Sequence, residues 1–133
     1  MSRQEIRDQA ALLTRPGTVV RCVDDGENVV VILEPFTPPN AAQYNPHKLD
    51  ALAFIVPSLY PDACPDATGF YVKPLTTLLA STGAEPRSTA ETALLGEQWR
   101  KFSWAPKTFK WDPNTDTLAT HLATIEVRFR KGD

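Results

Sequence analysis

The sequence predicts a single α+β domain over residues 1–133, in which a helix at each end flanks a four-stranded antiparallel meander and an irregular segment. Apolar residues at helical spacing occur near both ends of the chain. Between residues 18 and 74, short apolar runs are separated by turn residues, as in strands joined by hairpins and loops. Strands that follow one another in sequence, with helices at the ends, are typical of α+β domains.

The first half of the chain predicts a helix followed by a hairpin. A helix is expected from Ser2 to Thr14, because apolar residues recur there every three or four positions and Pro16-Gly17 provides a stop. Residues 18–25 (TVVRCVDD) are predicted to form a strand. Asp25-Gly26 is a hairpin signal, so residues 28–36 (NVVVILEPF) are the expected partner strand.

The middle of the chain predicts a loop, two further strands and a change of period. Residues 37–48 hold the prolines and asparagines of a long loop. The third and fourth strands are expected at residues 49–57 (LDALAFIVP) and 67–74 (ATGFYVKP). After these strands, the apolar spacing predicts helix-like segments at residues 75–82 and 88–99.

The last third predicts an irregular segment and a helix. Residues 102–113 (FSWAPKTFKWDP) hold too many prolines and aromatic residues for a regular element. Residues 116–129 carry apolar side chains at helical spacing, with Asp116 or Thr115 as the expected N-cap.

The composition is that of a globular protein and excludes several function classes. The hydrophobic share of 42% is ordinary for a globular protein. The net charge of −2 gives no indication of a cationic surface for nucleic acid. No apolar run is long enough to cross a bilayer, and the N-terminus lacks the apolar stretch of a signal peptide, so we expect a cytoplasmic protein without membrane contact. The two cysteines and two histidines form no metal motif, so neither a metal nor a cofactor is expected.

Two short motifs give the sequence a more specific resemblance. Pro57, Tyr60-Pro61 and Pro65 follow the third predicted strand, where the prolines fix a rigid turn and the tyrosine can pack beneath it. Further on, Trp111-Asp112-Pro113 directly precedes the last predicted helix. In order and spacing these motifs resemble those of the ubiquitin-conjugating (UBC) fold of E2 enzymes, over most of the chain.

The resemblance implies a site. In E2 enzymes the catalytic cysteine lies eight residues before the tryptophan, and the corresponding residue here is Ser103. The His-Pro-Asn tripeptide expected upstream is replaced by Leu94, Leu95 and Gly96, and a single helix follows the tryptophan motif. This reduced form is most similar to the prokaryotic E2-like families from bacterial operons that also encode a ubiquitin-like protein, an E1-like adenylating enzyme and a peptidase.

The resemblance implies an E2-like transferase. It would accept the C-terminus of a ubiquitin-like protein from an E1-like enzyme, as an oxyester on Ser103, with an E3-like protein or the peptidase as a further partner. Because a serine hydroxyl needs a base, His121 is the candidate general base, and Asp116 is the candidate to orient or replace it. The alternative is a catalytically inactive E2 variant that serves as a docking module for a ubiquitin-like protein or an E1-like partner.

Each of these residues also has a structural interpretation. Ser103 can be a packed or turn-capping serine, His121 can lie at the core boundary, and Asp116 can be an N-cap. The tryptophans at positions 104 and 111 are expected to anchor the core or a pocket wall. Cys64 lies in the proline turn with no basic neighbour in sequence, so we expect a structural or incidental role for it, and Cys22 is expected to be buried.

Overall fold

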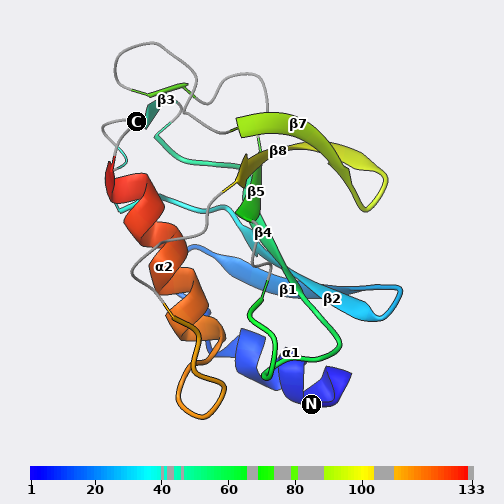
Figure 1. The fold of residues 1–133 in the computed structure, drawn as a ribbon. Helices are drawn as coiled ribbons and strands as arrows, with labels where there is room; N and C mark the ends of the chain where they lie inside the picture. The colour runs from blue at the N-terminus through cyan, green and yellow to red at the C-terminus, as the bar shows by residue number, and fades with distance from the viewer. Residues whose placement is uncertain are drawn as a thin grey trace.

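The computed structural model describes residues 1–39, 41, 44–45, 47–65, 69–73, 79–80, 89–103 and 110–131. A helix lies near each end of the chain, and α2 runs across one face of a curved sheet (Figure 1). No helix in these described ranges is long and apolar enough to span a membrane. In chain order the elements are α1 (Arg3–Ala11), β1 (Val19–Asp25), β2 (Asn28–Glu34), β3 (Tyr44–Asn45), β4 (Ala51–Val56), β5 (Gly69–Lys73), β6 (Leu79–Ala80), β7 (Thr89–Leu94), β8 (Glu97–Ser103) and α2 (Leu118–Lys131).

The N-terminal helix begins where a capping box forms. The Ser2 hydroxyl accepts a hydrogen bond from the Glu5 N–H, and the Glu5 carboxylate accepts one from the Ser2 N–H. The bond from the Ser2 N–H stabilises the ionised carboxylate and lowers the pKa of Glu5. Ile6 and Ala10 face the core. The predicted helix is therefore confirmed, although it ends at Ala11 rather than Thr14.

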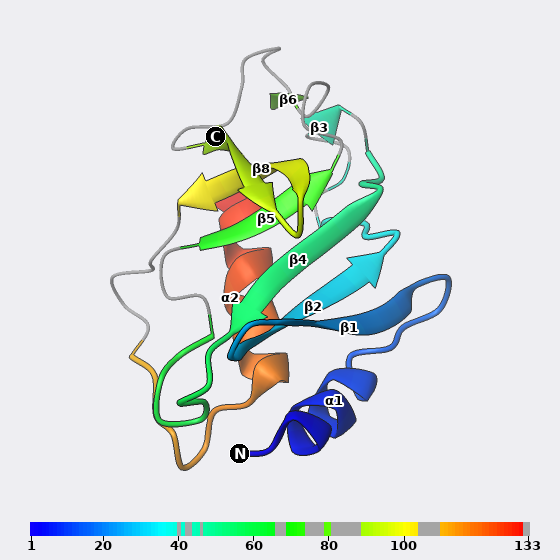
Figure 2. The same ribbon diagram turned by 90° about the vertical axis from the view of Figure 1, so that its right-hand side faces the viewer.

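The main sheet is antiparallel and has the strand order β1-β2-β4-β5-β8-β7 (Figure 2). Its first four strands are the predicted meander. Asp25 pairs with Asn28, so the turn between β1 and β2 is formed by Gly26 and Glu27, one position beyond the predicted signal. Gly26 has a φ of 60°, which glycine adopts at little cost.

The sheet has six strands rather than four, because residues 89–99 form no helix, in contrast to the helix-like segment expected at residues 88–99. They contribute β7 and the start of β8, which pair through a tight hairpin. The two central residues of the turn, Leu95 and Gly96, have φ values of 54° and 76°, the backbone of a type I′ turn. Of the other helix-like prediction, residues 79–80 form β6, which pairs with β3 inside the predicted long loop, and the remainder lies outside the described residues.

Apolar side chains pack on both faces of the sheet, because successive residues of a strand point to opposite sides. The helix-covered face holds the larger cluster, in which Phe129 of α2 contacts aromatic rings from three strands and a loop. The opposite face, which we call the open face, is not covered by α1 or α2 (Figures 1 and 2). Its smaller buried cluster comprises Val30, Ile32, Ala51, Ala53, Tyr71, Leu94 and Trp99.

The C-terminal helix is confirmed, but it begins at Leu118, two residues after the predicted first residue. Thr117 immediately precedes the helix, and its N–H donates to the Thr120 hydroxyl at 3.2 Å. Asp116 therefore precedes the N-cap position and, as described below, closes a turn.

Candidate active site

Ser103 is the last residue of β8, and its side chain is exposed. It lies directly opposite Gly69, the first residue of β5. The sequence placed Ser103 inside an irregular segment, whereas the structure gives it a fixed register in the sheet. The segment that follows, residues 104–109, lies outside the described residues, and so does the expected tryptophan at position 104.

Gly69 allows β8 to approach β5 unusually closely beside Ser103. A Cβ atom built on Gly69 would lie 1.9 Å from the Phe102 carbonyl oxygen and 3.2 Å from the Ser103 Cα. The φ of Gly69 is 152°, a conformation that side-chain-bearing residues rarely adopt. The position of the Phe102–Ser103 backbone therefore depends on the absence of a side chain at position 69.

The alternation of β8 places Ser103 on the open face. Trp99, four residues earlier, packs into the cluster of that face. The Lys101 ammonium lies 5.4 Å from the ring centroid of Tyr71, which belongs to the same cluster. Trp99, Lys101 and Ser103 are two residues apart in turn, so their side chains project to the same side of the strand.

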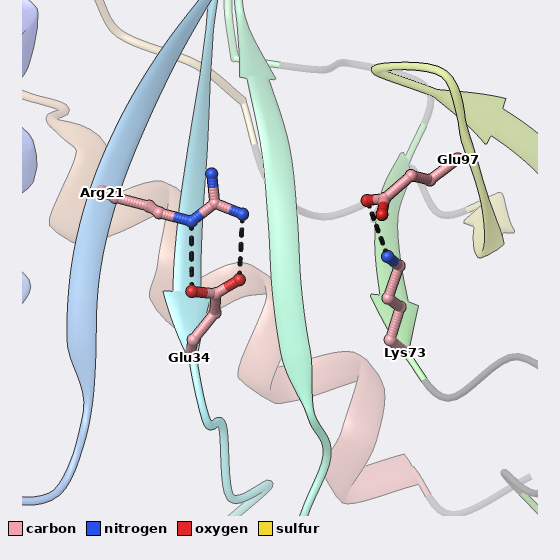
Figure 3. A network of polar contacts seen from close by, with 4 residues as sticks. All are labelled: Arg21, Glu34, Lys73 and Glu97. Carbon is pink, nitrogen blue, oxygen red and sulfur yellow. Dashed lines mark hydrogen bonds and ion pairs between the residues drawn. The ribbon is translucent and has the colours of Figure 1, made fainter.

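Charged side chains cover part of the open face. Arg21 forms two hydrogen bonds to the Glu34 carboxylate at 3.0 and 3.1 Å, and Lys73 donates to Glu97 at 2.8 Å. Figure 3 shows both pairs in front of the strands, with α2 behind them. The Lys73 ammonium also lies 4.5 Å from the Trp99 ring centroid, and its hydrogen bond to Glu97 lowers the pKa of that carboxyl.

His121 lies on the other side of the sheet. It is on α2, only 6% exposed, and its ring meets the Phe54 ring edge-on at a centroid distance of 5.0 Å. Phe54 belongs to the helix-covered cluster. Burial lowers the pKa of His121 to about 4, and its Nε2 has no hydrogen-bond partner among the described residues. The structure therefore does not bring the predicted base to the predicted nucleophile: the sheet lies between them.

Asp116 has partners within its own turn. Its carboxylate accepts a hydrogen bond from the Asp112 N–H at 2.7 Å, and its own N–H donates to the Asp112 carbonyl at 2.8 Å. These two bonds close the turn that leads from Trp111 into α2. These hydrogen bonds support a structural role for Asp116, whose carboxylate is engaged in its own turn.

Trp111 anchors the chain after the candidate nucleophile. Its indole N–H donates to the Pro61 carbonyl at 2.7 Å, and its ring centroid lies 5.9 Å from that of Tyr60. The Tyr60 hydroxyl in turn donates to the Gln9 side-chain oxygen at 2.6 Å, so the two sequence motifs meet each other and α1. Trp111 packs, half-buried, against the larger core cluster, as expected of a core anchor.

The cysteines are not part of this arrangement. Cys64 is half-buried in the proline turn, and its thiol donates to the Pro65 carbonyl at 3.3 Å. Cys22 is half-buried in β1 rather than fully buried, and desolvation raises its pKa, which disfavours the reactive thiolate. Among the described residues, no group of three or more histidine, cysteine or acidic side chains could hold a metal ion.

Sequence reasoning missed two residues beside Ser103. Lys101 shares its face and Gly69 lies across from it, but both relations depend on the register of β8. The sequence signal for this strand was the alternation of Trp99, Lys101 and Ser103. It was hard to recognise because the aromatic residues and prolines that follow indicate an irregular segment. The tripeptide Leu94-Leu95-Gly96, which stands where the E2 resemblance leads one to look for His-Pro-Asn, lies in the β7–β8 turn and brings no asparagine there.

The burial of His121 makes a prediction for the pH dependence of stability. A histidine with a pKa of about 4 in the folded protein and about 6.5 unfolded binds more protons when unfolded, so stability falls as the pH falls between these values. We expect the free energy of unfolding to lose about 2–3 kcal/mol from this group between about pH 7 and pH 4.5. Urea unfolding at both pH values measures the loss.

His121→Leu isolates this contribution, because the variant should retain the acid-induced loss from carboxylates but not the part due to the buried imidazole. His47→Gln, at an exposed loop position, is the matched control and should behave as the wild type. An unchanged pH dependence in His121→Leu would contradict the assignment.

The fold and the motifs define an E2-like domain: an N-terminal helix, an antiparallel sheet, a Tyr60-Pro61 turn packed under Trp111, and a C-terminal helix. No curated protein and no solved structure matches the chain significantly. The family model described as Prokaryotic E2 family E matches residues 6–131. The chain therefore belongs to prokaryotic E2 family E, and membership implies a ubiquitin-like protein and an E1-like enzyme as partners in general.

Proposed function

We propose that this chain is an E2-like carrier in a bacterial ubiquitin-like conjugation pathway and that Ser103 is its acceptor. The observation that carries the proposal is the placement of a hydroxyl nucleophile at an exposed strand end, eight residues before the tryptophan that anchors the following turn. In the loading step, the Ser103 oxygen attacks the thioester carbonyl carbon of the E1-bound modifier. The carbon–sulfur bond breaks, the E1 thiol is released with the hydroxyl proton, and an oxyester forms.

The positions of His121 and Asp116 support structural roles for these residues rather than catalytic ones. His121 is buried on the helix-covered face, and Asp116 is engaged with Asp112. We therefore assign both to the structure of α2 and the turn before it. The activated thioester supplies the driving force for loading, and the base that the serine hydroxyl needs is a group other than His121 and Asp116.

Formation of an adduct tests the proposal. The protein is incubated with ATP and with the ubiquitin-like protein and E1-like enzyme of the same genome, and products are separated by mass. We expect a one-to-one adduct that resists thiol reductants, is cleaved by hydroxide and is lost in Ser103→Ala. A reductant-sensitive adduct lost in Cys64→Ala would contradict the assignment.

A docking module without transfer activity is the second candidate. It is favoured by the β7–β8 turn at Leu95-Gly96 and by the burial of His121, which leave Ser103 without an asparagine or histidine partner among the described residues. A pocket of about 300 Å³ between α1 and α2, with Leu12 83% exposed at its edge, offers an apolar contact surface. Binding of a ubiquitin-like or E1-like protein without any adduct would favour this function.

A further inference from the structure

We propose that Lys101 is an amine acceptor for the group carried by Ser103, so that the chain modifies itself through an isopeptide bond at Lys101. This inference rests on the proposed function of Ser103. It adds a modification site and a second chemical step, and it is argued from the geometry of β8 and β5.

Lys101 lies close to Ser103 along β8. Lys101 and Ser103 are two residues apart on one strand and project to the open face. Their Cα atoms are therefore separated by about 6.6–6.8 Å, given the rise of a β-strand. A lysine carries its amine on a flexible four-carbon stem, which is long enough to reach the acyl carbon on its neighbour.

The neighbouring strand, β5, leaves space beside Ser103. The residue directly across from Lys101 is Tyr71, and the residue across from Ser103 is Gly69. Because glycine has no side chain, nothing projects from β5 beside Ser103 on the open face. The lysine stem that lies along Tyr71 can therefore turn towards Ser103 without displacing another side chain of that strand.

Among the described residues, Lys73 is a second lysine on the open face, and its surroundings differ from those of Lys101. Lys73 is held by Glu97 at 2.8 Å and lies over Trp99. Trp99 is four residues from Ser103, which corresponds to about 13 Å along a strand. Position along the strand therefore favours Lys101 over Lys73 as the acceptor.

The chemistry of the step balances without a further reactant. The neutral Lys101 amine attacks the ester carbonyl carbon, the bond between that carbon and the Ser103 oxygen breaks, and the oxygen takes the proton lost by the nitrogen. The products are an amide at Lys101 and a free Ser103 hydroxyl.

Isolation of the preformed ester provides the test. The loaded protein is separated from ATP and the E1-like enzyme, incubated in a mildly alkaline buffer, and sampled before and after hydroxide treatment. We expect hydroxide-resistant product to accumulate with first-order kinetics that are independent of protein concentration. Peptide mass spectrometry should place the bond at Lys101, and Lys101→Arg should prolong the life of the ester and reduce the resistant product at least tenfold.

Lys73→Arg and Lys110→Arg are the matched controls and should still form the resistant product. Ester without a bond at Lys101, or a bond at Lys107 or Lys110 instead, would overturn the inference and leave the function of Ser103 standing. Loss of the ester itself in Lys101→Arg would overturn the acceptor role and assign Lys101 to loading. Absence of any ester in the wild type would overturn both proposals.

Discussion

Replacing Phe129 with alanine is expected to lower the free energy of unfolding by about 3–5 kcal/mol, the range for fully buried aromatic residues. Phe129 is 0% exposed and joins α2 to the sheet. Its ring centroid lies 5.4–5.9 Å from those of Phe36, Tyr44, Phe70 and Phe102. Truncation leaves a cavity where these four rings meet. Equilibrium unfolding in urea, followed by tryptophan fluorescence, measures the loss.

Phe129→Leu is the matched variant, because it retains most of the apolar volume while losing the ring contacts. It should cost clearly less than the alanine substitution. Val127→Ala, at a helix position that is 41% exposed, serves as the control for helix propensity and should change stability by less than about 1 kcal/mol. Equal losses at positions 127 and 129 would contradict the central packing role of Phe129.

Gly69→Ala is expected to reduce adduct formation at Ser103 at least tenfold while leaving a folded protein. The added Cβ would meet the Phe102 carbonyl oxygen at 1.9 Å, so the end of β8 must move. Overpacking of this kind costs about 1–3 kcal/mol in stability. The adduct assay described above, performed alongside urea unfolding, separates the displacement of Ser103 from a general loss of structure.

Gly17→Ala is the matched control for the backbone. Gly17 also has a positive φ, 78°, but a Cβ there would contact nothing within 4 Å. It should therefore cost about 1–2 kcal/mol from the conformation alone and leave adduct formation intact. If Gly69→Ala formed adduct at the wild-type rate, the close approach of β5 and β8 would have no part in positioning Ser103.

The four strands of the predicted meander were found from sequence because their apolar residues alternate or run continuously and their ends carry glycine or proline. The β7–β8 hairpin was missed for a local reason. Leu94 and Leu95 are adjacent, which suggests a helical apolar stripe, whereas Leu94 is buried and Leu95 occupies a turn position with a φ of 54°. A leucine in that conformation carries no recognisable turn signal.

The candidate site could be predicted in part. Ser103 was found by counting from Trp111, because the tryptophan motif has a fixed spacing. The burial of His121 could also be predicted from the sequence. His121 lies three residues after Leu118 and four before Ile125, so it shares the buried face of the helix with them. The side of the sheet on which Ser103 projects was not encoded in any single motif, because it depends on the pairing of β8 with β5.

Under the function proposed above, the chain would have two separate docking sides, because Ser103 projects from the open face while both helices lie elsewhere. The sheet acts as a partition: a modifier attached at Ser103 would extend away from α2, and the pocket between α1 and α2 would stay accessible to a second protein. Loading and partner recruitment would then take place without competition for the same surface. In this geometry, the enzyme that delivers the modifier and the protein that receives it could bind the chain at the same time.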